Sequence, residues 1–181
     1  MKKSEKIILS FLLLILIGLI GFLEYIRIEK KLKGRNTGFV YFLKSGTENS
    51  YLFKVKREIP LKGSIEKKLI VLIRYLLEGP KDEERETGIS TSIPEGVKLL
   101  GVKIRDGVVY VNFSEEIEKG GGTSLMEMRL AQIVYTATQF PPAEKVRLLI
   151  DGKKIKYFSN EGIMVDKLLT RDDFKEFENM N

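Results

Sequence analysis

From residue 37 onward, the spacing of apolar residues switches between the two-residue period of strands and the longer period of an α-helix. Residues 39–43 form a nearly continuous apolar run. In the next run, Tyr51, Phe53 and Val55 alternate with Leu52, Lys54 and Lys56, and Pro60 ends the segment. Both runs are predicted to be strands, because short runs rich in aromatic and β-branched residues and bounded by breakers favour that structure.

Ser64 opens a segment with helical periodicity. Its apolar residues fall on one face: Ile65, Leu69, Leu72 and Leu76. Gly79 and Pro80 follow in the order that ends a helix. The polar stretch 81–87 is predicted to be a mobile loop, and it lacks the Asp and Asn spacing of a calcium-binding loop.

Asp106-Gly107 separates two runs, 100–104 and 109–113, in which apolar and polar residues alternate. Asp-Gly between such runs is among the strongest short-range signals for a hairpin. We therefore predict a β-hairpin over these residues.

A glycine run, 120–122, leads into a second helical segment. Ser124 and Glu127 have the spacing of a capping box, so Ser124 is the expected N-cap. Apolar residues again gather on one side of this helix: Met126, Leu130, Ile133, Val134 and Ala137.

The segment 134–152, VYTATQFPPAEKVRLLIDG, reads as a helix end, a proline stop at 141–142 and a strand over 146–150. Residues 155–158 are a candidate partner for that strand. Four residues are expected to shape the helix end and to take no part in chemistry: Thr136, Thr138, Gln139 and Phe140.

The order of elements is strand, strand, helix, hairpin, helix, strand. Two helices, each with one apolar face, can cover one side of a small, mostly antiparallel sheet. We therefore predict an α+β domain over residues 38–181, within the size range of a single domain and without an internal repeat.

The N-terminal part has a different character. Residues 7–23 form an uncharged run of 17 residues, rich in Leu and Ile, which as a helix reaches roughly 25 Å. Its length and the lack of a small-residue cleavage site after it favour an uncleaved transmembrane anchor over a cleaved signal peptide. Without Cys there is no lipid-modified cysteine. We expect a short basic tail (1–6), an anchor (7–23) and a juxtamembrane linker (24–37) before the domain.

The formal charge of +6 is unevenly placed. Residues 1–35 hold eight Lys/Arg against three Asp/Glu, which leaves 23 against 22 in the rest of the chain. The basic balance thus belongs to the flanks of the apolar run, and we expect no nucleic-acid partner. Five basic residues follow the run and three precede it, so the positive-inside rule by itself favours a cytoplasmic domain.

The composition excludes several kinds of catalytic site. The chain has no His or Cys, which rules out a Ser-His-Asp triad, a thiol nucleophile and His- or Cys-bound metals. The remaining candidates are carboxylates that lie in turns or loops, where acidic residues are common for other reasons: Glu115, Glu116, Asp106, Asp151, Asp172 and Asp173. We expect no catalytic residue, no cofactor and no metal.

Two further features have a functional and a structural interpretation. Residues 120–124 could present backbone N–H groups to a phosphate, but they lack the Lys and the Gly spacing of known nucleotide loops, which favours a turn with an N-cap. Five aromatic residues could form a binding surface, although core packing explains most of them: Tyr75, Tyr110, Tyr135, Phe140 and Phe158.

Four segments, in order, resemble the GerMN domain of spore germination and sporulation proteins. They are Leu-Leu-Glu-Gly-Pro at 76–80, Ser-Ile-Pro-Glu-Gly-Val-Lys-Leu-Leu at 92–100, the hairpin segment 106–114, and 134–152. The segment 169–174, Leu-Thr-Arg-Asp-Asp-Phe, also resembles a tail found in such proteins. Ala137 and Pro142-Ala143 depart from the pattern, and a single domain with a plain anchor differs from a two-domain lipoprotein.

The resemblance implies a non-enzymatic domain outside the cell membrane, anchored to it by one helix and similar to modules that build rings. The expected role is that of a scaffold or assembly module of the cell envelope, linked to sporulation or germination, with a protein partner or self-association. An extracytoplasmic module that binds cell-wall glycan or a small molecule is the alternative, and a carboxylate-dependent hydrolase is a third.

Overall fold

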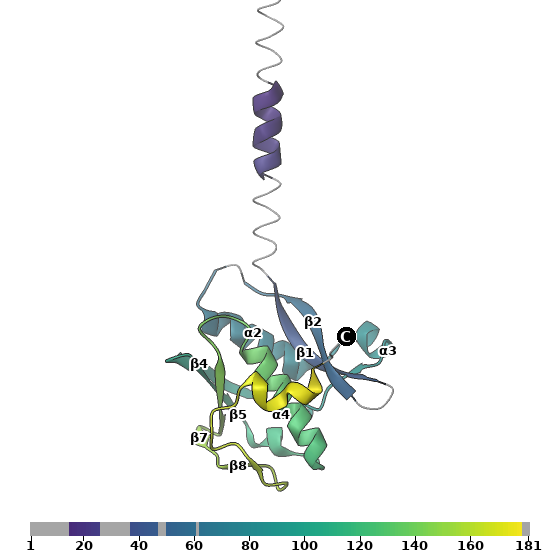
Figure 1. The fold of residues 1–181 in the computed structure, drawn as a ribbon, viewed down its shortest axis with the longest axis vertical. Helices are drawn as coiled ribbons and strands as arrows, with labels where there is room; N and C mark the ends of the chain where they lie inside the picture. The colour runs from purple at the N-terminus through teal and green to yellow at the C-terminus, as the bar shows by residue number, and fades with distance from the viewer. Residues whose placement is uncertain (1–14, 26–36, 47–49, 61, 179–181) are drawn as a thin grey trace, which may run out of the picture. The chain divides into compact units, whose positions relative to one another are not determined.

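The computed structural model describes residues 15–25, 37–46, 50–60 and 62–178. The chain divides into two compact units, Met1–Thr37 and Gly38–Asn181. In the first unit, residues 15–25 form a helix (Figure 1). Its large apolar side chains are exposed. None of the helices in the described part of the chain is long and apolar enough to span a membrane. The expected anchor lies partly outside the described residues, at 7–14, and so does most of the expected linker, at 26–36.

The second unit contains the following helices and strands: β1 (Thr37–Ser45), β2 (Ser50–Glu58), α2 (Ile65–Glu78), α3 (Asp82–Glu86), β3 (Ile89–Ser90), β4 (Leu99–Arg105), β5 (Val108–Phe113), the 3-10 helix η1 (Glu115–Glu118), α4 (Thr123–Ala137), β6 (Lys145–Ile150), β7 (Lys153–Lys154), β8 (Tyr157–Phe158), β9 (Ile163–Met164) and the 3-10 helix η2 (Arg171–Phe177). This content confirms the α+β class predicted from the sequence.

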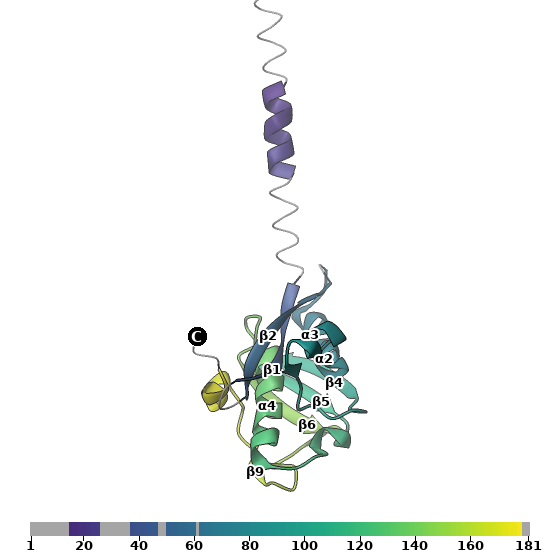
Figure 2. The ribbon, with the colours of Figure 1, turned by 90° about the vertical axis from the view of Figure 1, so that its right-hand side faces the viewer.

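The strands form three sheets, with the orders β2-β1-β3, β4-β5-β6-β7 and β8-β9. In the four-stranded sheet, β5 and β6 run parallel, while β4–β5 and β6–β7 are antiparallel. The predicted arrangement, two helices on one face of one sheet, is therefore too simple. Helix α4 lies between β1–β2 on one side and β5–β6 on the other, so the two larger sheets are separated by a helix (Figure 2).

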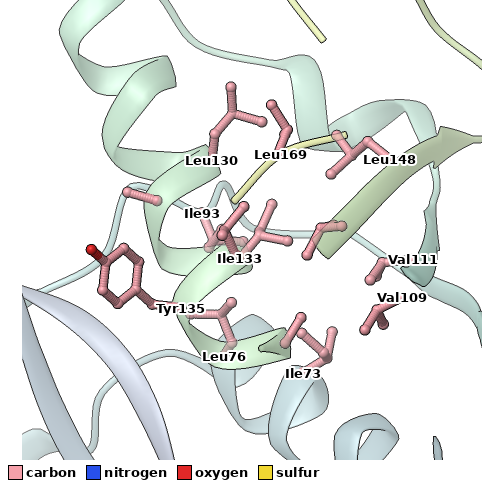
Figure 3. Close-up of a cluster of buried hydrophobic side chains, with 14 of the residues drawn as sticks. Ile73, Leu76, Ile93, Val109, Val111, Leu130, Ile133, Tyr135, Leu148 and Leu169 are labelled. Carbon is pink, nitrogen blue, oxygen red and sulfur yellow. The ribbon is translucent and has the colours of Figure 1, made fainter. Parts of the chain in front are cut away.

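The core is formed by α2, α4 and the inner face of the four-stranded sheet. Ile73 and Leu76 of α2 point toward Val109 of β5, and Ile133 of α4 lies at the centre of the same cluster (Figure 3). All four side chains are fully buried. Removing one large aliphatic side chain from such a core typically costs about 2–5 kcal/mol, so this cluster fixes the relative positions of the three elements.

Two local predictions are confirmed in detail. The Ser64 hydroxyl accepts a hydrogen bond from the Lys67 N–H at 3.4 Å, and Gly79 ends α2 with a φ of 81°. In the hairpin, Asp106 and Gly107 have φ values of 51° and 75°. A type I′ turn needs a positive φ at both positions, which Asp-Gly provides at little cost.

Three local predictions are wrong. Residues 82–86 form the short helix α3, because Glu84 accepts a hydrogen bond from the Lys81 N–H at 2.9 Å and pairs with Arg57. The partner of β6 is Lys153–Lys154, while Tyr157–Phe158 pairs with β9 in a separate sheet. The residue before α4 is Gly122, not Ser124, and the helix start is satisfied from another segment, as described below.

Candidate functional site

The carboxylates singled out in the sequence do not form a single cluster. Asp151 and Glu115 follow strands that end side by side, since Ile150 lies opposite Phe113 in the parallel pair β5–β6. Asp106 lies in the turn before β5, at the other end of that sheet. In the described part of the chain, no group of three or more acidic residues is arranged to hold a metal ion.

The other acidic candidates have partners on the surface. Asp172 pairs with Lys175 at 2.9 Å, and Glu116 lies 3.7 Å from the Lys119 ammonium. Burial alone would raise the pKa of Asp173, but hydrogen bonds from Lys167 and from the Thr170 N–H and hydroxyl lower it. A hydrogen bond from Ser114 likewise lowers the pKa of Glu116. A carboxyl group with a lowered pKa is a poor general acid near neutral pH.

The glycine loop before α4 already holds an anionic group of the chain itself. The Glu161 carboxylate accepts a hydrogen bond from the Gly122 N–H at 3.0 Å and one from the Thr123 hydroxyl at 3.4 Å. Carboxylates stabilise helix N-termini by satisfying unpaired N–H groups and by interacting with the helix dipole. This explains why the expected capping box of Ser124 and Glu127 is not used. It also gives the phosphate interpretation of this loop no support.

Polar side chains on α4 bind the open backbone edge of β1. The Thr136 hydroxyl accepts a hydrogen bond from the Tyr41 N–H at 3.1 Å, and the Gln132 amide donates to the Tyr41 carbonyl at 3.0 Å. Just beyond the end of α4, Gln139 accepts from the Phe39 N–H and donates to its carbonyl, both at 2.7 Å. β3 pairs with β1 only at residues 43 and 44, so these side chains take the place of a neighbouring strand.

Arg129 of α4 is 1% exposed and has no carboxylate partner among the described residues. Its guanidinium donates to the carbonyl groups of Ser92 (2.8 Å), Ile117 (2.6 Å) and Lys119 (2.8 Å). Burial lowers the pKa of Arg129 to about 10, which leaves it charged at neutral pH. Arg129 therefore joins two loops to the helix, and the geometry supports a structural role.

A second arginine fixes the C-terminal segment on α4. The Arg171 guanidinium stacks over the ring of Tyr135 at 4.8 Å and over that of Tyr41 at 5.5 Å, and its Nε donates to the Thr138 hydroxyl at 2.9 Å. Burial, together with Glu178, raises the pKa of Tyr135. Thr136, Thr138 and Gln139 thus hold other segments of the fold, which extends their expected role of shaping the helix end.

The aromatic residues singled out in the sequence fall into two groups. Tyr135 and Phe158 are buried, and Tyr75 and Phe140 pack against the core, as expected. Tyr110 lies at the centre of the outward-facing side of the four-stranded sheet, opposite Lys103 and Arg147. Sequence reasoning missed this surface, although the alternation in β4 and β6 is a signal that could have revealed it.

An apolar surface lies on the small sheet β8-β9. Tyr157 and Met164 face each other across the two strands and are 49% and 55% exposed. Leu125, in the first turn of α4, is also exposed at 38%. Aromatic residues and Met are enriched in protein–protein interfaces, so this hairpin is a candidate contact surface.

Taken together, the fold is that of a small α+β module in which the buried polar groups hold segments in place. A family model described as "Germane: Sporulation and spore germination" matches residues 39–156, more than half of the chain. The chain therefore belongs to the Germane family. This confirms the GerMN resemblance and extends it to β1 and β2, which precede the four segments that carried it.

Solved structures support the same assignment. The tandem GerMN domains of the sporulation protein GerM from Bacillus subtilis match with 26% identity and a TM-score of 0.60, over 76% of this chain. The chain spans 46% of that tandem structure. The first GerMN domain alone matches with 24% identity and a TM-score of 0.61, over 75% of this chain and 98% of that domain. A candidate lipoprotein from Clostridium perfringens shares the fold, with 20% identity, a TM-score of 0.56 and coverage of 80% and 93%. A comparison with curated proteins gave no match.

Proposed function

We propose that this protein is a non-enzymatic assembly module of the cell envelope that acts in sporulation or germination through contacts with another protein or with copies of itself. Membership of the Germane family supports the link to sporulation. The observation that carries the proposal is the exposed pair Tyr157 and Met164 on β8-β9, a hairpin outside both larger sheets.

The arrangement of polar groups also supports a non-enzymatic role. The buried Arg129, Gln132 and Thr136 all hydrogen-bond backbone or side-chain groups of the fold, and the acidic candidates are dispersed or paired at the surface. None of these groups combines a shared cleft with a pKa shift that suits acid–base catalysis.

The proposed location is the outer side of the cell membrane, with an N-terminal anchor over residues 7–23. The apolar composition of that run and the family membership support this location, while the charge distribution around the run favours the opposite orientation. Protease treatment of intact and broken cells, followed by detection of the domain, decides between the two.

Crosslinking in the native envelope tests the assembly role. We expect the wild-type chain to form crosslinked species with a protein, and the double variant Y157S/M164Q to lose most of them. The variant L100Q is the matched control, because Leu100 is 49% exposed on β4, in the other sheet. Unchanged crosslinking in Y157S/M164Q contradicts the proposed surface, and recovery of wall fragments without any protein partner favours the alternative of a glycan-binding module.

A further inference from the structure

The outward-facing side of the four-stranded sheet carries a concentration of basic residues. Along β4, β5 and β6, alternate positions are buried in the core, among them Val102, Val111 and Leu148. The positions between them face away from the core. Four of these outward positions are basic, and Lys154 of β7 lies beside them, paired with Leu149. We call the five residues together the basic face: Lys103, Arg105, Lys145, Arg147 and Lys154.

The strand register places four of these cations in two rows. Lys103 and Arg147 lie on either side of Tyr110, and Arg105 and Lys145 lie on either side of Val108. Each row follows one strand, β4 or β6, with β5 between them. Strands are about 4.8 Å apart and rise about 3.3 Å per residue, so the rows are roughly 10 Å apart and successive cations in a row roughly 7 Å.

The cations of the basic face are not neutralised by ion pairs. In the described part of the chain, no ion pair joins a residue of the basic face to a carboxylate. The Arg147 guanidinium instead donates to the backbone carbonyls of Val165 and Asp166. Acidic residues border this surface. Glu66 of α2 accepts a hydrogen bond from the Ile104 N–H of β4 at 2.8 Å, and Asp106 and Glu144 lie at the end of the sheet where the hairpin turns.

The charge of the basic face differs from that of the domain as a whole, which is nearly neutral. Residues 36–181 hold 23 basic and 22 acidic residues, so a cluster of five cations on one face reflects segregation of charge on the surface. Such a surface attracts anions by long-range electrostatics and does so more strongly at low salt.

We propose that the basic face binds a linear polymer that carries phosphate groups along its length. A single extended chain fits along β5, between the two rows, where long Lys and Arg side chains from both sides reach successive phosphates. Because the cations recur roughly every 7 Å along each row, an extended polyanion can contact several of them at once. Tyr110 and Asn112 supply apolar and hydrogen-bonding contact along the same track. This site lies on a different surface from the β8-β9 hairpin, so its failure would leave the proposed assembly role unaffected.

Binding of the full chain, in neutral detergent, to long-chain inorganic polyphosphate tests this site. The variant K103Q/R105Q/K145Q removes three cations from exposed positions and is expected to fold normally by circular dichroism. The control K56Q/K67Q/R74Q removes the same charge from exposed positions on β2 and α2. Single variants K103Q and K145Q keep the test informative if the triple variant does not fold.

We expect the affinity to fall at least about tenfold in the face variant and less than about twofold in the control. We also expect the plot of log affinity against log salt concentration to become less steep, by about 2 in slope. The face variant makes fewer phosphate contacts and therefore displaces fewer counterions on binding. Equal loss in both triple variants, or no binding of polyphosphate by the wild type, overturns the proposal. So does full competition by orthophosphate at the same phosphate concentration, which indicates a single-anion site. Binding to phosphatidylglycerol vesicles without binding to polyphosphate would assign the surface to a membrane instead.

Discussion

Helices α2 and α4 are similar in length and in the spacing of their apolar residues, but they lie in different surroundings. α2 buries four residues along one face, and its other side is exposed to solvent. α4 buries ten of its fifteen residues, on all sides, because it lies between two sheets. Arg129, Gln132 and Thr136 are among them. Lys67, Arg74 and Glu78 of α2 therefore face solvent, while polar residues at similar spacing in α4 contact the backbone of other segments. Glu66 is the exception in α2, because it accepts a hydrogen bond from the Ile104 N–H of β4 at 2.8 Å.

The comparison of the two helices shows what polar residues can do inside a small domain. In α4 they satisfy the carbonyl and N–H groups of segments that have no neighbouring strand at that point, such as the edge of β1. Buried polar groups are costly only when they lack partners, and here each finds one. α4 thus connects segments that hydrogen bonds within a single sheet would not bring together.

The largest difference in stability between equivalent substitutions in the two helices is expected at their arginines. Replacing Arg129 by Met leaves three inward-facing carbonyl groups without their donor and should lower the free energy of unfolding by about 3–4 kcal/mol. The same replacement at Arg74, exposed on α2, should change it by less than about 0.5 kcal/mol. Urea unfolding of both variants measures the difference. Similar stability of the two variants would contradict the structural role of Arg129.

A smaller effect is expected at Gln132. Met has a similar shape, but it cannot accept the hydrogen bonds from the Ser92 N–H and hydroxyl or donate one to the Tyr41 carbonyl. Gln132→Met should therefore lower the free energy of unfolding by roughly 2–3 kcal/mol. On α2, Leu72→Met keeps the volume and loses no hydrogen bond, so it should cost less than about 1.5 kcal/mol. Amide hydrogen exchange provides a local check, since the Ser92 amide should exchange faster only in the Gln132 variant.

The two buried arginines should respond differently to pH. Arg57 is 8% exposed and is therefore buried, as Arg129 is. Unlike Arg129, it pairs with a carboxylate, because its guanidinium donates two hydrogen bonds of 2.6 Å to Glu84. The hydrogen bond from Arg57 lowers the pKa of Glu84 below its ordinary value of 4.5. The pair therefore stabilises the fold fully above about pH 4.5, and that contribution is lost as the pH falls through the lowered pKa.

Glu84→Gln should cost about 1–2 kcal/mol at neutral pH, and its difference from the wild type should shrink as the pH falls from about 4.5 through the lowered pKa of Glu84. Urea unfolding from pH 7 to pH 3 measures this. Arg129 is held by carbonyl groups, which do not titrate in this range, so the cost of Arg129→Met should stay constant. A Glu84→Gln difference that persists unchanged at pH 3 would argue against the ion pair.

The smallest effect concerns the helix starts. Ser64→Ala removes the N-cap of α2 and should cost about 1 kcal/mol, while Ser124→Ala should cost less than about 0.3 kcal/mol because Ser124 caps nothing in α4. Glu161→Ala should instead destabilise α4, by about 0.5–1 kcal/mol. Thermal unfolding distinguishes the three variants. A larger loss of stability for Ser124→Ala than for Glu161→Ala would show that Ser124, and not Glu161, caps α4.

Much of the fold could be predicted because its signals are local. Ser64 and Gly79 bound α2, and Asp106-Gly107 turns the hairpin, each through contacts within a few residues. Errors arose where a partner comes from far along the chain. Residues 82–86 were expected to be a loop because Arg57, which supports α3 through Glu84, lies 27 residues away. Glu161 is 39 residues from Gly122, and nothing in the local sequence reveals that contact.

The sequence by itself determined the longer helices and strands, the α+β class, the family and the absence of His and Cys chemistry, because these depend on composition and on short-range periodicity. Only the tertiary structure decided that the strands divide into separate sheets, that α4 is enclosed between two of them, and that five cations share one face. The physical reason is that a sequence pattern gives the side on which a residue lies, while the segment that meets that side is chosen by packing of the whole domain.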